Sequence, residues 1–206
     1  MTHIFKVLSL SILLIFSSLS FAAGSSQTAN STPYVLIQNV GNQLFNDIAK
    51  LNELDEKTKR EQLKLLIKNQ LMPHIDTKFV SFKLLGKHVR EIKKEQAVTF
   101  IDAVEQYLVG TYTNVLMSYK GQDVHFIEPV FDAASQYASV KSEIVAEGAP
   151  TIDMIFKFRK SKSGQWQVYD IEAESISLLS AKQKEIVSRI SEIGIDAVSK
   201  ELIAKS

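Results

Sequence analysis

Cysteine is absent from the sequence, and other residues that mark particular functions are scarce. The 206 residues include only 4 His, 4 Pro and 8 Gly, and 24 basic residues nearly balance 23 acidic ones, for a formal charge of +1. Without cysteine the chain has no disulfide framework and no thiol nucleophile, so packing must stabilise the fold. A charge so close to zero argues against a nucleic-acid partner, whose backbone requires a basic face, and we expect none.

Catalytic and metal-binding motifs are missing as well. The sequence contains neither a G-x-S-x-G nucleophile motif nor a phosphate-binding P-loop. His74, His88 and His125 lie in different predicted elements, and none has a second histidine at the spacing of a metal-ligand pair. We therefore expect no metal site and no cofactor.

One acidic cluster is the exception. Asp170, Glu172 and Glu174 alternate along a predicted strand, and alternate residues of a strand share a face. Two of these carboxyl groups could form a general acid/base pair. The alternative interpretation is a solvated strand end whose carboxylates pair with lysines.

Residues 1–22 have the pattern of a secretory signal peptide. Lys6 lies near the start, a short apolar run follows, and small residues precede the expected cleavage site after Ala22. The apolar run is too short to span a bilayer comfortably. We predict a disordered leader over residues 23–32, and a single domain over residues 33–206.

Helical periodicity dominates the chain as far as Gly121. Thr32 and Pro33 predict the start of a first helix, with the threonine as its N-cap. Asp55 is predicted to cap a second helix. The apolar residues over 93–119 predict a long helix that is apolar around more of its surface than a surface helix needs, so it is expected to be central.

After Gly121 the period changes to the alternation of strands. Apolar residues alternate with polar ones in 124–127, 136–147 and 152–158, and a further strand begins at Trp166. Turn residues separate these segments, which indicates an antiparallel meander with one apolar face.

Two helices are predicted to end the chain, with Gly194 stopping the first and Asp196 capping the second. The predicted fold class is therefore α+β. Helices pack on one face of a curved antiparallel sheet of about four strands and enclose an apolar cavity.

Residues 164–179 begin as a strand and end in a helix. Trp166 and Val168 share one face of the strand, whereas Ile171 and Ala173 would fall on the other face if the strand were regular. We therefore predict a bulge or bend near Asp170.

A longer pattern runs through the same stretch and continues on both sides of it. Its residues are Trp166, Val168, Asp170, Ala173, Glu174 and Ser177, then Lys182, Gln183, Glu185 and Gly194-Ile195-Asp196, and upstream Pro33-Tyr34, Leu71-Met72-Pro73-His74-Ile75 and Leu84-Leu85-Gly86. This pattern resembles that of the MlaC/toluene-tolerance family of periplasmic phospholipid-binding proteins. Members of that family usually have glycine where this chain has Ser175, so a positive φ at this position would strain the serine.

The resemblance implies a function without catalysis. It implies a periplasmic carrier, a monomer, that shuttles diacyl phospholipid between the outer and inner membranes and so maintains outer-membrane lipid asymmetry. It also implies two docking partners: an inner-membrane ABC transporter with an MCE-domain subunit, and an outer-membrane lipoprotein–porin complex. Two alternatives stay open: an enzyme of cone-shaped α+β fold that uses Asp170 or Glu174 on an apolar substrate, and a lipid-free envelope adaptor.

Many large apolar side chains are predicted to point at one interior. An ordinary filled core would explain them, but a cavity for acyl chains agrees with the general character of apolar ligand sites. The candidate lipid-binding residues are Phe82, Leu85, Phe100, Val104, Tyr107, Val140, Ile144, Met154, Phe156, Phe158, Trp166, Val168, Ile171 and Ile176. Ile176 and Leu178 follow the bent end of the strand, where they are expected either to rim the cavity mouth or to pack against a partner.

Overall fold

The computed structural model describes residues 31–206, so the predicted signal peptide and most of the predicted leader lie outside the described residues. Helices come first in the chain and strands second. The helical part contains α1 (Pro33–Lys50), α2 (Glu56–Leu66), a π-helical turn (Ile67–Leu71), a 3-10 turn (Met72–His74), α3 (Thr77–Leu85), a second 3-10 turn (Gly86–Arg90) and α4 (Lys94–Met117). The strands are β1 (Asp123–Ile127), β2 (Tyr137–Val145), β3 (Ile152–Lys160), β4 (Trp166–Ala173) and β5 (Ile176–Ser177), followed by α5 (Leu178–Ile193) and α6 (Ile195–Ala204).

The predicted helix starts are confirmed at α1 and α2. The Thr32 hydroxyl accepts a hydrogen bond from the Val35 N–H at 3.2 Å, and the Asp55 carboxylate accepts from two N–H groups of the first turn of α2 at 3.1 Å. The predicted cap of the last helix is wrong. Gly194, at φ 81°, is the N-cap of α6, so Asp196 lies in the first turn, where its charge still favours the helix dipole.

The sheet is an antiparallel meander in the order β1-β2-β3-β4-β5, which confirms the α+β class. It has five strands, where about four were predicted. The additional strand, β5, has only two residues and pairs with the end of β4, with Glu172 opposite Ser177 and Ala173 opposite Ile176. A turn at Glu174 and Ser175, both at positive φ, joins the two strands.

The bulge predicted near Asp170 is present in β4. Val168 lies opposite Phe158 and Asp170 lies opposite Lys157, so Tyr169 is the extra residue. The bulge returns the apolar residues that follow it to the face of those that precede it. Trp166 and Val168 before the bulge and Ile171 after it pack in one cluster with α1.

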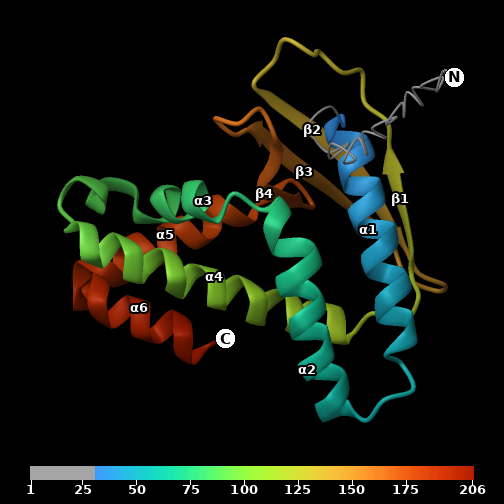
Figure 1. The fold of residues 1–206 in the computed structure, drawn as a ribbon, viewed down its shortest axis with the longest axis horizontal. Coiled ribbons are helices and arrows are strands. Elements are labelled where there is room, and N and C mark those ends of the chain that lie inside the picture. Colours follow the sequence, from blue (N-terminus) through green and yellow to red (C-terminus); the bar gives the residue numbers. More distant parts are fainter. Residues whose placement is uncertain (1–30) are drawn as a thin grey trace, which may run out of the picture.

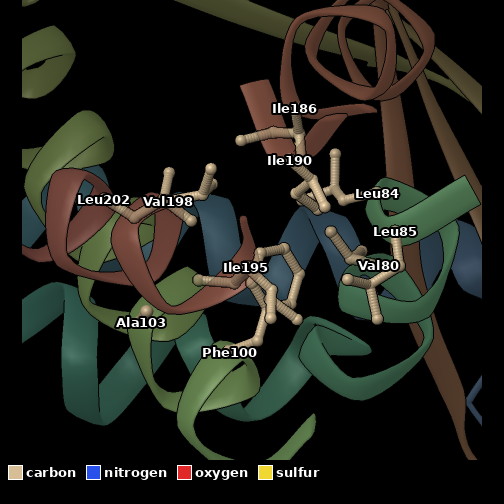
Figure 2. Packing of buried hydrophobic residues seen from close by; sticks show 11 residues of the cluster. Val80, Leu84, Leu85, Phe100, Ala103, Ile186, Ile190, Ile195, Val198 and Leu202 are labelled. Atoms are coloured by element: carbon tan, nitrogen blue, oxygen red, sulfur yellow. The ribbon is translucent and has the colours of Figure 1, made fainter. Parts of the chain in front are cut away.

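In the described part of the chain, the core consists of three clusters. Figure 1 shows α1 lying over the sheet, and α4, α5 and α6 lying together at one side of it. The first cluster joins α3, α4, α5 and α6 (Figure 2) through Val80, Leu84, Leu85, Phe100, Ala103, Val104, Ile186, Ile190, Ile195, Val198 and Leu202. The second joins α1, α2 and the following turns through Leu44, Ile48, Leu63, Ile67, Met72 and Ile75. The third seats α1 on the sheet through Ile37, Val140, Phe158, Trp166 and Val168.

The segment before α3 is tied to the bulged strand. Ile75 forms a parallel bridge with Val168, and the Asp76 N–H donates to the Val168 carbonyl at 2.9 Å. Asp76 also caps α3 by accepting from the Phe79 N–H at 3.0 Å, and it forms an ion pair with Arg159 of β3. These contacts fix α3 beside β4. Among residues 31–206, no helix is both long enough and apolar enough to cross a membrane.

Candidate functional site

A cavity of about 140 Å³ lies between the bulged strand β4 and helices α3, α4 and α5. Its wall is mostly apolar, and only two of its residues carry a charge, Asp170 and Lys182. The uncharged residues of the wall are Ile75, Val80, Leu84, Tyr107, Leu108, Thr111, Tyr112, Val168, Tyr169, Ile171, Leu178 and Leu179.

The bulge explains how one strand contributes so much of this wall. Four consecutive residues of β4, from Val168 to Ile171, line the cavity. In a regular strand, consecutive side chains point to opposite faces, so only two of the four could do so. The extra residue Tyr169 breaks this alternation at the point where the strand meets α3 and α5.

Two helix edges border the place where the cavity reaches the surface. Tyr107 and Thr111 lie one turn apart on α4, and Leu178 and Lys182 lie one turn apart on α5. Leu178 is 48% exposed although it lines the cavity, and Ile176, two residues earlier, is 61% exposed. Of the two residues predicted to rim the mouth, Leu178 lines the cavity, whereas Ile176 is an exposed apolar residue outside its wall, and a rim there stays a prediction.

Asp170 anchors the start of α5 to β4. The carboxylate is nearly buried, and its two oxygens accept hydrogen bonds from the Ser177 hydroxyl at 2.8 Å and the Leu179 N–H at 3.0 Å. Burial raises the pKa of Tyr112 to about 12, and the negative charge of Asp170 adds to this effect. The tyrosine is therefore a neutral hydrogen-bonding group in the wall at physiological pH.

Lys182 places an ammonium group in the same wall. Its Nζ lies 4.7 Å from the centre of the Tyr107 ring and 2.7 Å from Oε2 of Glu185. Burial acts to lower the pKa of Lys182, whereas hydrogen bonds with Glu185 and Tyr107 act to raise it. The hydrogen bonds have the larger effect, so the pKa lies above its ordinary value. The ammonium group is therefore charged at neutral pH.

The acidic cluster considered as an acid/base pair is divided among different partners. Asp170 holds the first turn of α5, and Glu172 forms an ion pair with Lys157 of β3. Glu174 is exposed in the turn, where its carboxylate accepts from the Asp153 N–H at 3.2 Å. Within residues 31–206, no group of three or more His, Cys, Asp or Glu side chains is arranged to hold a metal ion.

The candidate lipid-binding residues lie in different places. Three of them line the cavity, namely Tyr107, Val168 and Ile171. Others belong to the filled core: Leu85, Phe100 and Val104, with Phe82 beside them, in the cluster of Figure 2, and Val140, Phe156, Phe158 and Trp166 beneath α1. Ile144 and Met154 are half-buried on the same sheet face as Val140, and Ile176 is exposed. Contact of any of them with lipid stays a prediction.

Sequence reasoning missed several residues of the wall. Val80, Leu84 and Leu108 carry no signal that separates them from core, because lining and core residues are both apolar. Lys182 and Thr111 do carry a signal in the sequence. Each lies one helical turn from an apolar residue of the wall, so a polar residue interrupts an inward-facing stripe.

Comparisons with known proteins bear on the family and the fold of the chain. A family model described as "MlaC protein" matches residues 38–204. The intermembrane phospholipid transport system binding protein MlaC of Haemophilus influenzae is 27% identical over 188 residues, which cover 90% of this chain and 87% of that protein. A phospholipid-binding protein from Ralstonia solanacearum, solved in complex with a phospholipid, superposes with a TM-score of 0.73 at 18% identity, covering 85% of this chain and 97% of that one. The last similarity concerns the fold.

Proposed function

The chain belongs to the MlaC protein family, because the family model covers most of its length, and we propose from this that it is a carrier of diacyl phospholipid. The observation that carries the proposal is the apolar cavity at the β4 bulge, which reaches the surface beside Leu178. The acyl chains enter between α4 and α5, and the head group stays outside. The names of the related proteins, a phospholipid transport binding protein and a phospholipid-binding protein, support this function.

The cavity must widen to hold a lipid. Its volume of about 140 Å³ is close to that of an engineered protein cavity of about 150 Å³ that binds benzene. Two acyl chains contain about thirty methylene groups, far more than this space can hold. The exposed rim of α4 and α5 is the place where separation of two elements would enlarge the cavity without breaking a strand pairing of the sheet.

The free energy of burial requires direct transfer between membranes and carrier. At about 0.8 kcal/mol per buried methylene, thirty methylenes correspond to roughly 24 kcal/mol relative to water. Release of lipid into solvent would therefore be negligible. Transfer between a bilayer and the cavity is nearly neutral, because both environments are apolar.

We propose that residues 33–206 act as one carrier domain, a monomer, in the periplasm after cleavage of residues 1–22. The docking partners proposed for it are an inner-membrane ABC transporter with an MCE-domain subunit and an outer-membrane lipoprotein–porin complex. Together they would move phospholipid between the two membranes and maintain outer-membrane lipid asymmetry. Such partners supply what the energetics require, a contact that opens the cavity beside a membrane.

Native mass spectrometry of the purified protein tests the carrier function. We expect a retained phospholipid in the wild-type protein and much less in Thr111→Trp, because Thr111 lines the cavity and tryptophan would fill it. Val104 is unsuitable for this test because it is fully buried in the core. Thr99→Trp is the matched control, since Thr99 is an exposed residue of the same helix.

Other results for the purified protein would support the enzyme or the lipid-free adaptor instead of the carrier. A protein that carries no lipid and hydrolyses an apolar ester, with activity lost in Asp170→Asn, would be an enzyme. A protein that carries no lipid, takes none up from vesicles and has no such activity would be an adaptor. Equal lipid content in the wild-type and Thr111→Trp proteins would show that the lipid lies elsewhere.

A further inference from the structure

Among residues 31–206, Lys182 is the one cationic residue in the wall of the cavity, and the proposed function assigns it no role. Of its neighbours in the wall, only Asp170 is charged, and both oxygens of that carboxylate are already bonded to the first turn of α5. A lysine in an apolar wall requires a compensating partner, because a desolvated charge is unfavourable. Its present partner, Glu185, lies on the surface with 47% of its side chain exposed.

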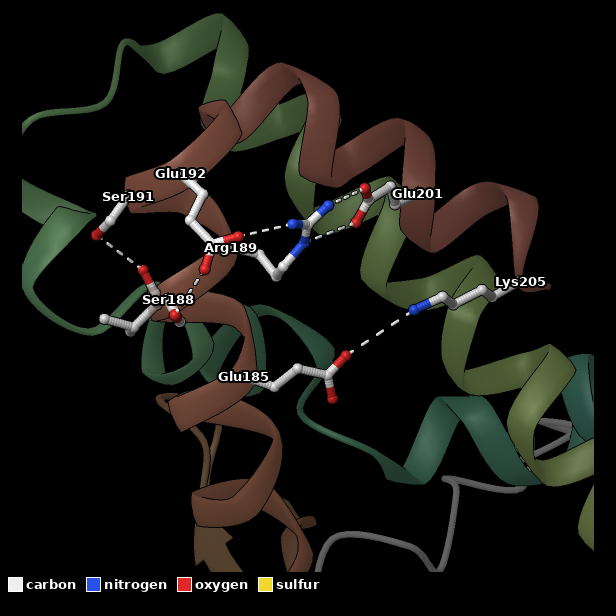
Figure 3. Close-up of polar contacts among 8 residues, drawn as sticks. Glu185, Ser188, Arg189, Ser191, Glu192, Glu201 and Lys205 are labelled. Carbon is white, nitrogen blue, oxygen red and sulfur yellow. Dashed lines mark hydrogen bonds and ion pairs between the residues drawn. The ribbon is translucent and has the colours of Figure 1, made fainter.

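The ion pair of Lys182 with Glu185 is of a kind that exchanges readily. The two residues are three positions apart on one helix, and pairs of this type with a solvent-exposed carboxylate contribute little to stability. Glu185 also has a second cationic neighbour, because Nζ of Lys205 on α6 lies 3.9 Å from its other oxygen, as Figure 3 shows. Glu185 therefore keeps a counter-charge when Lys182 changes partner.

The position of Lys182 matches the border between tails and head group. Its Nζ lies over the Tyr107 ring of α4, and Lys182 itself is one turn after Leu178, the exposed apolar residue of the wall. A lysine at such a border buries its methylene stem and keeps its ammonium group near water. The ammonium has three N–H donors, and phosphate oxygens are strong acceptors of charge-assisted hydrogen bonds.

We propose that Lys182 binds the phosphate of the phospholipid at the mouth of the cavity, exchanging Glu185 for a phosphate oxygen. This inference rests on the proposed function and adds the selection of cargo to it. The cavity then accepts diacyl lipids that carry a phosphate in preference to uncharged diacyl lipids with identical tails. Glu185 acts as the competitor that occupies the ammonium group when no lipid is bound.

Two lipids that differ only by a phosphate test this selection. Lipid-free protein is incubated with an equimolar mixture of dioleoyl phosphatidic acid and dioleoylglycerol in detergent, and the bound lipids are quantified by mass spectrometry. We expect phosphatidic acid to dominate in the wild-type protein. Lys182→Gln should lower the bound ratio of phosphatidic acid to dioleoylglycerol about tenfold, which is the effect of about 1.4 kcal/mol. The amount of dioleoylglycerol bound should not fall.

Two further variants should have predictable effects on the ratio of bound phosphatidic acid to dioleoylglycerol. Glu185→Gln should raise the ratio, because it removes the competitor of the phosphate. Lys184→Gln should leave the ratio unchanged, because Lys184 is an exposed residue of the same helix outside the cavity wall. An unchanged ratio in Lys182→Gln, with lipid loading intact, overturns the proposal and leaves the carrier function standing. Failure of the wild-type protein to bind either lipid overturns both.

Inorganic phosphate separates a lipid site from a free-anion site. Calorimetric titration of lipid-free protein with inorganic phosphate should show no saturable binding, because a single ammonium group without the tails binds phosphate weakly. Saturable binding of inorganic phosphate that is lost in Lys182→Gln, together with an unchanged lipid ratio, would make Lys182 a site for a soluble anion and overturn the proposal.

Discussion

The Asp170 carboxylate accepts a hydrogen bond from the Ser177 hydroxyl at 2.8 Å, and this contact joins the end of β4 to the start of α5. The same hydroxyl accepts from the Ser180 N–H at 3.0 Å and so caps the helix. The second carboxylate oxygen accepts from the Leu179 N–H. Two side chains thus satisfy two of the free N–H groups at the start of α5, beside the cavity wall.

Removal of this contact is expected to destabilise the protein. Ser177→Ala loses a helix cap and a hydrogen bond to a charged group, so we expect the free energy of unfolding to fall by about 1–2 kcal/mol. Asp170→Asn should cost about 1–3 kcal/mol, because its amide NH2 cannot accept one of the two hydrogen bonds. Urea unfolding of both single variants and the double variant measures the coupling.

We expect a coupling energy of about 1 kcal/mol between the two residues. Ser188→Ala is the control, an exposed serine of the same helix whose loss should change stability by less than about 0.5 kcal/mol. Additive effects of Ser177→Ala and Asp170→Asn would mean that the hydrogen bond contributes nothing in solution.

Ser175 is expected to be a site of stored strain. Its φ is +66°, a conformation that glycine adopts at no steric cost, whereas an L-residue there is disfavoured by roughly 1–2 kcal/mol. Ser175→Gly should therefore raise the free energy of unfolding by about 1 kcal/mol, after allowing for the greater entropy of glycine in the unfolded chain. Ser188→Gly, inside a right-handed helix, should instead lower it by about 0.5–1 kcal/mol. A destabilised Ser175→Gly protein would contradict the positive φ.

Gly86 is required by both its backbone conformation and its surroundings. Its φ is +53°, and a Cβ added there would lie 2.8 Å from Cγ2 of Val187 on α5. Gly86→Ala should therefore cost about 3 kcal/mol in thermal or urea unfolding, through strain and overpacking together. Gly121→Ala isolates the strain, because φ is +92° there and nothing lies within 4 Å of the added Cβ. Equal losses in the two variants would show that Val187 moves aside freely.

Sequence patterns predicted the bulge because it preserves a hydrophobic face. The apolar residues at Val168 and Ile171 are three positions apart, and a regular strand would place one of them in water. An extra residue at Tyr169 was therefore required by burial alone. Strand β5 could not be predicted in this way. It has two residues and depends on positive φ at Glu174 and Ser175, residue types that rarely adopt it.

Only a few of the residues that line the cavity could be predicted from the sequence. Val104 and Tyr107 are both apolar residues of α4 that face the interior, yet Val104 is fully buried in the core and Tyr107 lines the cavity. The difference depends on how α3, α5 and α6 pack around α4, which is set by contacts between segments far apart in the sequence. Periodicity describes which face of a helix is buried, but it cannot tell a neighbouring side chain from an empty space.

The exposed rim supplies the last prediction. Ile176 is 61% exposed, so Ile176→Glu places its carboxylate in water, and we expect stability to change by less than about 0.5 kcal/mol. If the rim inserts into a membrane surface during exchange, an isoleucine contributes about 1.5–3 kcal/mol there. Its replacement by glutamate should therefore slow transfer of fluorescent phosphatidylglycerol from the loaded protein to phosphatidylethanolamine/phosphatidylglycerol vesicles by about tenfold or more.

Val98→Glu separates an effect of the rim from an effect of added charge. Val98 is an exposed apolar residue of α4, with 53% of its surface accessible, and it lies outside the cavity wall. Both variants add the same negative charge, so both meet the same repulsion from anionic vesicles at long range. Slower transfer in Ile176→Glu alone would assign membrane contact to this segment, because Ile176 lies two residues before Leu178 of the cavity wall, whereas Val98 lies near the start of α4. Equal transfer rates in the two variants would mean that exchange takes place without contact between this rim and the bilayer.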